Sequence, residues 1–370
     1  MAALAAATGA LLIAFVLWDA FETILLPRRI PGGLRLSRLV LRGLWGAWSA
    51  GAGLFRTRNG RENFLGLYAL LSLIGLLVVW AAGLIAGFAA LDWAFGSRLA
   101  AGAGPAGFRT DLYMSGTTFF TLGLGDVTPV STAARALTVI EAGTGFGFLA
   151  LVLAYLPVLY QAFSRRESRI TMLDQWGGSP PTAAVLLRRC FESRDPGRAL
   201  DALLRDWEQA AAEILESHLS YPILAFFRSQ HDNQSWIAAL AAILDTCALV
   251  IAGIEGLDPF QARMTFAICR HTLVDVTQNA GRRPRPGPDP RGAGEHLAEL
   301  HAWLEAARVP LARGPDADRR LAVLQALYAP YLRALSELLL MPLPTWLPPE
   351  RARYNWETTA WARTAGVDGH

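Results

Sequence analysis

The sequence predicts an all-α protein with a membrane-embedded first half and a helical soluble second half. Two observations carry this prediction. The 370-residue chain is 53% hydrophobic and only 18% charged, which is too apolar for an ordinary soluble protein and too charged for an all-membrane one. Long uncharged runs end near residue 163, and the rest has the periodicity of packed soluble helices. The net charge of only +3 gives no reason to expect a nucleic-acid partner.

Residues 1–27 are expected to form an N-terminal transmembrane helix. Residues 2–26 supply about 25 mostly apolar positions, enough to cross a hydrocarbon layer of roughly 30 Å. The run starts uncharged and ends in a proline and two arginines, unlike a cleaved signal peptide. Asp19 and Glu22 share one face near its end. We expect them to reach the interface or to pair with arginines, with a gating role as the alternative.

Residues 28–62 form an arginine-rich segment with a single acidic residue, Glu62. Its arginines are Arg28, Arg29, Arg35, Arg38, Arg42, Arg56, Arg58 and Arg61. The positive-inside rule places this segment on the cytoplasmic side and the N-terminus outside. Arg35, Arg38 and Arg42 share a face, which predicts an amphipathic helix lying on the inner membrane surface. A voltage sensor is the alternative, but the arginine spacing breaks after two turns.

Residues 63–164 are expected to form the main membrane domain. Residues 64–91 are uncharged for about 28 positions and must therefore span the bilayer. A Gly/Ala-rich loop follows, and then Thr110 or Asp111 can cap a short helix that ends near Phe120. This helix is too short to cross, so it re-enters the membrane. Its partially negative C-terminal end favours cations.

The short helix leads into the run Thr121-Leu122-Gly123-Leu124-Gly125-Asp126. Such a run can direct its backbone carbonyls at one axis, where rings of oxygen atoms replace the water around a cation. Alternate residues must then adopt backbone angles that Gly123 and Gly125 reach freely. Thr121 adds a hydroxyl group at the inner end. The run is therefore predicted to be an ion-selectivity filter.

This run resembles the filter signature of the potassium-channel pore family, usually written T-V-G-Y-G-D. The resemblance covers roughly residues 64–163 and implies passive K⁺ conduction through a homotetrameric pore, because one chain provides one of four filter strands. It implies a location in the lipid bilayer of a bacterial inner membrane, with K⁺ as the permeant ion and no enzymatic activity or cofactor. Leu122 and Leu124 replace the usual valine and tyrosine. Leu124 is the larger departure, because the usual aromatic ring braces the filter from behind.

Three alternatives to a potassium-selective channel are open at this point. A weakly selective cation channel would follow if Leu124 does not preserve the filter. A subunit of a potassium uptake transporter is disfavoured, because such loops usually keep one filter glycine and this run has both Gly123 and Gly125. A sensor or interaction protein with a vestigial pore would pass no ions.

Residues 133–163 are predicted to be the second pore span, the inner helix. Glu141 is its only acidic residue. Either Glu141 lies behind the filter and bonds to Thr117 or Asp126, or it faces water in the cavity. Thr117 and Glu141 are thus the candidate supports of the filter.

Glycines and a proline in the same span are candidate bending points. In relatives of the pore family, a glycine at this distance after the filter is the hinge of the inner helix. That resemblance implies bending at Gly143, Gly145 or Gly147, with Pro157 adding a kink. Close helix packing is the alternative role for these glycines.

Residues 165–370 are predicted to be a cytoplasmic all-helical domain with a mobile Pro/Arg/Gly-rich loop near 281–294. The expected helices cover residues 181–192, 196–218, 223–229, 234–254, 259–278, 296–308, 317–340 and 349–364. Residues 236–254 are apolar enough for another span. Because Asp245 interrupts them, we interpret this stretch as the buried central helix of the domain.

The helical half has no motif that specifies chemistry. The titratable residues that could be assembled into a site are His218, His231, His271, Glu213, Asp232, Asp245 and Asp275. None has metal-ligand spacing, so each is expected to be a helix cap or a satisfied core group, without a structural metal. No nucleotide-binding fingerprint follows a strand. Either an unidentified ligand or protein acts on this half and couples it to the inner helix, or the domain only stabilises the tetramer.

Overall fold

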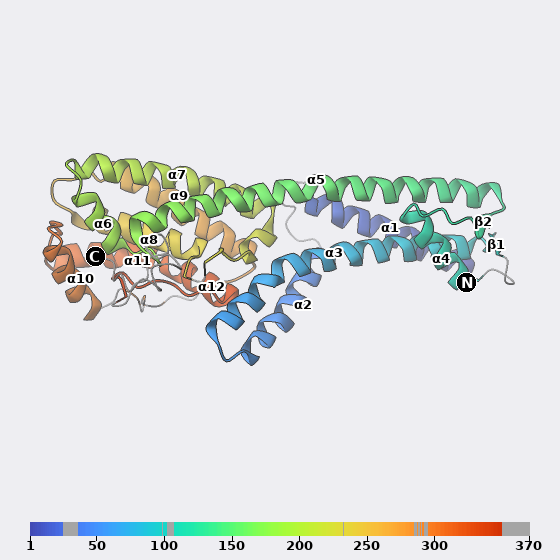
Figure 1. Ribbon diagram of the computed structural model, residues 1–370, viewed down its shortest axis with the longest axis horizontal. Coiled ribbons are helices and arrows are strands. Elements are labelled where there is room, and N and C mark those ends of the chain that lie inside the picture. The colour runs from blue at the N-terminus through green and yellow to red at the C-terminus, as the bar shows by residue number, and fades with distance from the viewer. Residues whose placement is uncertain are drawn as a thin grey trace, which may run out of the picture. The chain divides into compact units, whose positions relative to one another are not determined.

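The computed structural model describes residues 1–24, 36–97, 99–101, 107–231, 233–284, 287, 289, 291 and 295–349. The chain forms two compact units, Met1–Gln161 and Ala162–His370 (Figure 1). Four described helices are long and apolar enough to cross a membrane: Ala2–Ile24, Arg58–Ala94, Thr132–Gly177 and Trp236–Gly253. The expected all-α membrane architecture is confirmed.

Helix α1 (Ala2–Ile24) packs along α3 (Arg58–Ala94) in the first unit. Small residues allow the two backbones to approach closely. A Cβ atom added at Gly9 would lie 2.6 Å from the carbonyl oxygen of Gly87, and one at Gly87 would lie 2.6 Å from Ile13 Cγ1. The predicted spans at residues 2–26 and 64–91 are thus helices, and α3 begins earlier than the uncharged run.

Helix α2 (Leu36–Gly51) folds back beside the first turns of α3 through the short 3₁₀ helix η1 (Ala52–Leu54) (Figure 1). Trp48 stacks on Phe64 with ring centroids 4.5 Å apart, and its Nε1 donates to the carbonyl oxygen of Phe64 at 2.9 Å. The amphipathic helix expected here is present. Its placement on the inner membrane surface stays a prediction.

Asp19 of α1 is buried and holds three helices together. Its carboxylate accepts hydrogen bonds from Trp80 Nε1 of α3 at 2.8 Å and from the backbone N–H of Ser37 at 3.0 Å. The Ser37 hydroxyl also donates to it, at 3.2 Å. Among the described residues, Asp19 therefore bonds to a tryptophan and a serine, because packing of α1 against α3 covers its face; the nearby Arg28, Arg29 and Arg35 lie outside the described residues.

Helix α4 (Phe108–Phe119) is the expected short helix. It begins after Gly107, so neither Thr110 nor Asp111 is its N-cap residue; the Asp111 carboxylate instead accepts from the Ser97 hydroxyl at 2.6 Å. On either side of α4, strand β1 (Leu99–Ala101) pairs antiparallel with strand β2 (Val127–Pro129). This two-stranded ribbon was not expected, because the glycine and alanine residues near β1 carry no strand pattern.

Helix α5 (Thr132–Gly177) is much longer than the predicted inner helix. It runs for 46 residues, or about 69 Å at 1.5 Å per residue, with Pro157 inside it. The sequence analysis ended this element near residue 163, where charged residues begin. Loss of hydrophobicity marks the end of a membrane span and not the end of a helix, since serine, arginine and glutamate continue a helix well. The helix ends at two consecutive glycines, Gly177 and Gly178.

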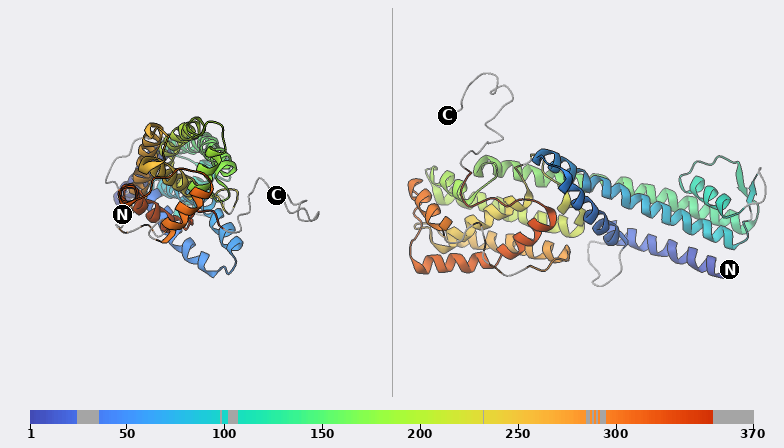
Figure 2. Two further views of the ribbon diagram at one scale, coloured as in Figure 1. Left: turned by 90° about the vertical axis from the view of Figure 1, so that its left-hand side faces the viewer. Right: turned by 90° about the horizontal axis from the view of Figure 1, so that it is seen from below.

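The second unit is a bundle of helices (Figure 2). After α5 it contains α6 (Ala183–Phe191), α7 (Pro196–Ser220), η2 (Pro222–Phe226), α8 (Trp236–Gly253), α9 (Phe260–Asn279), α10 (Glu295–Ala306), α11 (Pro315–Ala326) and α12 (Ala329–Leu339). Although α8 is apolar enough to span a membrane, 89% of it is buried inside the fold. It contacts α6, α9, α11 and α12, so it is the central helix that the sequence predicted.

Four predictions for this unit need correction or fall outside the description. The helix expected at 317–340 is two helices, because Pro330 lacks an N–H and cannot continue α11. The helix expected at 223–229 is the 3₁₀ turn η2. In the loop predicted to be mobile, Asp289 and Arg291 are buried and ion-paired. The helix expected at 349–364 lies almost entirely outside the described residues.

Candidate functional site

The backbone of the pore loop alternates in conformation as the filter interpretation requires. Thr121, Gly123 and Gly125 have φ values of 56°, 58° and 77°. A chain that alternates between left- and right-handed angles can turn successive carbonyls to one side, which a regular strand cannot do. Glycine adopts positive φ without cost, whereas Thr121 in this region carries local strain of about 1–3 kcal/mol.

The pore loop, residues 121–126, is exposed in the single chain. Leu122 and Leu124 are 60% and 62% exposed, and the other residues from Thr121 to Asp126 are exposed as well. No residue of the described part of the chain buries Leu124. Within the described ranges, no side chain therefore braces the position where the resembling family has a tyrosine.

Two groups of contacts tie the loop to α4. At its inner end, the N–H groups of Thr121 and Leu122 donate to the carbonyl oxygens of Thr118 and Thr117 at 3.0 and 2.8 Å. The Thr117 hydroxyl donates to the carbonyl oxygen of Met114 at 2.9 Å. Thr117 thus supports the loop through its backbone, and its side chain bonds within the helix.

At the outer end, Tyr113 of α4 donates from its hydroxyl to Asp126 Oδ2 at 2.9 Å. The sequence analysis did not identify Tyr113. A usable signal was available, because Tyr113 is the only tyrosine in α4 and the loop must double back along that helix to reach Asp126. This bond holds the acidic end of the loop against the pore helix.

Glu141 of α5 is 1% exposed and lies against α4. Its carboxylate is hydrogen-bonded with the hydroxyl of Ser115, which also lies 2.8 Å from the carbonyl oxygen of Ile85. Glu141 is therefore packed behind the pore helix, but its partner is Ser115 and not Thr117 or Asp126. It does not face open water in the single chain.

The hinge candidates differ in their surroundings. A Cβ atom at Gly145 would collide with the carbonyl oxygen of Phe119, so this glycine is a contact between α5 and the end of α4. Gly143 and Gly147 have no atom within 4 Å of such a position. Pro157 lies inside an unbroken helical segment. Bending at Gly143, Gly147 or Pro157 stays a prediction.

The described members of the candidate set His218, His231, His271, Glu213, Asp232, Asp245 and Asp275 are not brought together in one site. Within the part of the chain that the structure describes, no three His, Cys, Asp or Glu side chains are placed to hold a metal ion. His271 pairs with Asp275 at 3.5 Å on the exposed face of α9, and Glu213 of α7 lies 3.6 Å from Arg169. Asp232 lies outside the described residues.

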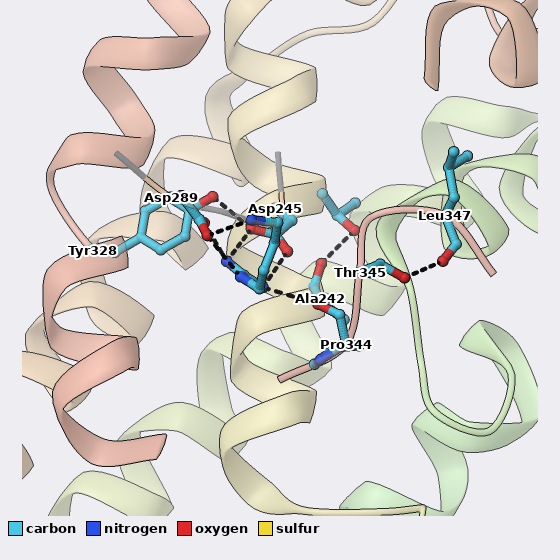
Figure 3. Close-up of polar contacts among 9 residues, drawn as sticks. Ala242, Asp245, Asp289, Tyr328, Pro344, Thr345 and Leu347 are labelled. Carbon is cyan, nitrogen blue, oxygen red and sulfur yellow. Dashed lines mark hydrogen bonds and ion pairs between the residues drawn. The ribbon is translucent and has the colours of Figure 1, made fainter. Parts of the chain in front are cut away.

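Asp245 belongs to a buried network at the centre of the bundle (Figure 3). Tyr328 donates to its Oδ1 at 2.6 Å, and Arg291 reaches its Oδ2 at 3.1 Å and Asp289 Oδ2 at 2.7 Å. Burial, and then the charge of Asp245, raises the pKa of Tyr328 well above its ordinary value. The tyrosine is thus a permanent donor, and the network is a satisfied core cluster.

Comparison with known proteins adds to this geometry. Residues 74–161 match the protein family described as "Ion channel". Over 150 residues the chain is 25% identical to the "Uncharacterized membrane protein YdjJ" of Bacillus subtilis (strain 168). That alignment covers 40% of this chain and 43% of the relative, so the chain spans less than half of the relative's length. No solved structure matches the chain.

Proposed function

We propose that this chain, whose residues 74–161 match the ion-channel family, is the subunit of a potassium-selective channel. The observation that carries the proposal is the alternation of positive φ at Thr121, Gly123 and Gly125, directly after a helix too short to cross a membrane. That backbone suits a row of carbonyl oxygens that replace the hydration shell of K⁺. Conduction is passive and requires no cofactor or enzymatic step.

The pore is a homotetramer in this proposal. One chain supplies one loop, and its residues 121–126 are exposed when the chain is alone. Four copies around an axis would bury these loops against one another. The bilayer that holds them is proposed to be a bacterial inner membrane, with the arginine-rich segment at residues 28–62 on the cytoplasmic side.

A weakly selective cation channel is the second candidate, and Leu124 favours it. A leucine fills space but cannot form the hydrogen bonds of an aromatic hydroxyl behind the filter. The bond from Tyr113 to Asp126 offers a substitute restraint from the pore helix. We therefore place potassium selectivity first.

Gating is proposed to use the continuity of α5. The same helix passes the pore loop and ends in the second unit, where Arg166 is buried by residues of α7 and η2. A ligand or protein that rearranges the second unit would act on the end of α5, which is part of that unit. Such a partner shifts a closed and an open state only through its different affinity for each.

Purified protein in liposomes tests the function. With a K⁺ gradient as the only driving force, wild-type protein should pass K⁺ much faster than Na⁺. Gly123→Ala should abolish the selective flux, because φ of 58° is strained for alanine, whereas Gly66→Ala in open space on α3 should keep it. Equal K⁺ and Na⁺ flux would favour the weakly selective cation channel. No flux of either ion would favour a sensor or interaction protein with a vestigial pore.

A further inference from the structure

The inner helix α5 touches the pore helix α4 along one face. Glu141, Gly145 and Phe148 are spaced four and three residues apart, which puts them on the same side of α5. Opposite them, Ser115 and Phe119 are four residues apart on α4. Two consecutive turns of each helix therefore meet directly behind the pore loop.

The first contact joins three helices at one hydroxyl group. The oxygen of Ser115 lies 2.8 Å from the carbonyl oxygen of Ile85 on α3 and within hydrogen-bond distance of Glu141 Oε1. Ser115 and Glu141 are both almost completely buried. If Ser115 is removed, a buried carboxyl group loses its partner, which costs more than the bond itself contributes.

The second contact leaves no space between the backbones. The carbonyl of Phe119 occupies the position where a side chain at Gly145 would begin. The ring centroids of Phe119 and Phe148 are 5.7 Å apart, and those of Phe148 and Trp80 are 6.5 Å apart. Phe119 is two residues before Thr121, so α5 determines where the loop starts.

In the part of the chain that the structure describes, nothing covers Leu124 of the same loop, which is 62% exposed. Its inner end is fixed by hydrogen bonds to the carbonyls of Thr117 and Thr118, which belong to the turn of α4 that α5 contacts. A small displacement of that turn therefore moves the carbonyls of the loop. Since selectivity depends on these oxygen positions, the contact with α5 bears on ion choice as well as on packing.

We propose that Glu141 is a positioning residue for the selectivity filter, acting through Ser115 to hold α4 against α5 and α3. This inference rests on the proposed channel function and deepens it. The inner helix and the filter are then one mechanical unit, and a movement of α5 changes the geometry of the filter. A role confined to stability would lower the yield of assembled protein and leave ion choice unchanged.

Substitutions at both ends of the contact test the proposal. Glu141→Ala and Ser115→Ala should each lower the K⁺/Na⁺ permeability ratio about fivefold or more, the smallest effect typical of coupled sites. The double variant should be no worse than either single variant, because both remove one contact. Glu141→Gln should restore most of the ratio, since its amide can donate to Ser115 while Ser115 donates to Ile85.

Gly145→Ala provides an independent variant if removal of the carboxyl group prevents assembly. Gly145→Ala should lower the K⁺/Na⁺ permeability ratio by displacing Phe119. Gly66→Ala has nothing near its added methyl group and should leave the ratio unchanged. An unchanged ratio in assembled Glu141→Ala, Ser115→Ala and Gly145→Ala protein would overturn the proposal. So would a Glu141→Gln ratio as low as that of Glu141→Ala.

A binding measurement separates failure of this inference from failure of the proposed function. K⁺ held in a filter should raise the unfolding temperature of the assembled protein more than Na⁺ does. If wild-type protein passes no ions but shows this K⁺-specific rise, conduction fails as a function. The positioning role would still be supported if the K⁺-specific rise in unfolding temperature is lost in Glu141→Ala and returns in Glu141→Gln. If the rise persists in Glu141→Ala, the positioning role is refuted.

Discussion

Arg166 at the end of α5 and His218 of α7 form a buried contact, with Arg166 Nη1 3.2 Å from His218 Nε2. A guanidinium group can only donate, so Nε2 accepts, and the proton of the neutral imidazole is on Nδ1. That proton is donated to the carbonyl oxygen of Ile214 at 2.9 Å. Arg166 also donates to the carbonyl oxygens of Leu224 and Phe227, both at 2.8 Å. Arg166 thus binds the end of α5 to its bundle through two backbone carbonyls and one tautomer of His218.

The contact predicts a pH dependence of stability. Burial, and then the charge of Arg166, lowers the pKa of His218 well below 6.5. Below pH 6.5 the unfolded chain binds a proton that the folded chain does not, so the free energy of unfolding falls as the pH falls. The slope from this group is at most about 1.4 kcal/mol per pH unit. Thermal unfolding of the full chain between pH 7.5 and 5.5 measures this change in the free energy of unfolding.

His218→Gln keeps an acceptor for Arg166 and removes the titration, so it should flatten this slope. His271→Gln is the matched control, because His271 is 59% exposed at its side chain and pairs only with Asp275 on its own helix among the contacts described. The same acid-side slope in His218→Gln and wild-type protein would contradict the assignment.

The bond between Tyr113 and Asp126 predicts a specific filter defect. Tyr113→Phe removes the donor without changing the ring, and should release the outer end of the loop. A neutral-to-charged bond at an exposed site contributes on the order of 1 kcal/mol, so we expect a two- to tenfold change, roughly, in the lifetime of the conducting state. Single-channel recording measures that lifetime. Asp126→Asn keeps an acceptor and should be milder; an unchanged lifetime in Tyr113→Phe would mean that the bond does not brace the loop.

The open surroundings of Gly143 and Gly147 allow a test of the hinge prediction. Alanine fits at both positions and is about 1 kcal/mol more favourable in a helix than glycine. If either residue is a hinge, the substitution should stiffen α5 and lower the open probability without altering the K⁺/Na⁺ permeability ratio. Pro157→Ala should act in the same direction if Pro157 helps the bend. Wild-type open probability in all three variants would exclude bending at these sites.

The Asp245 network predicts a large loss of stability from one substitution. Arg291→Met should lower the free energy of unfolding by about 3–5 kcal/mol, because it leaves two buried carboxylates without their cation. Denaturant unfolding of the full chain, followed by tryptophan fluorescence, measures the loss. Arg319→Met removes an exposed ion pair with Asp316 and should change the free energy of unfolding by less than about 1 kcal/mol. Similar losses in the two variants would show that the central network is not a stability determinant.

The length of α5 decides where the chain should be truncated to test gating. Both cuts remove His218, Leu224 and Phe227, the partners of Arg166. Cutting after Arg166 also removes the last turns of α5, whereas cutting after Gly178 leaves the helix complete. We expect the longer fragment to keep K⁺ flux and to change its open probability. If it stays tetrameric, as judged by cross-linking, and gates like wild type under every condition tested, the second unit does not control the pore.

Local signals in the sequence are enough to predict the pore module. The uncharged runs that became α1 and α3 are long enough to cross a bilayer whatever surrounds them. Gly123 and Gly125 permit positive φ wherever they stand, and both adopt it. Asp245 within an apolar run was sufficient to predict a buried central helix. Boundaries were less certain: the charged residues after Phe163 do not show that α5 continues to Gly177.

Only the tertiary structure decided which polar groups are partners. Glu141 bonds to Ser115, Asp126 to Tyr113, and Arg166 to His218. No periodicity connects such residues, because a buried polar group bonds to whatever the packed neighbouring helix presents, and that depends on crossing positions that are set by the whole core. The same reason makes Gly145 a packing contact: only the approach of Phe119 distinguishes it from Gly143 and Gly147.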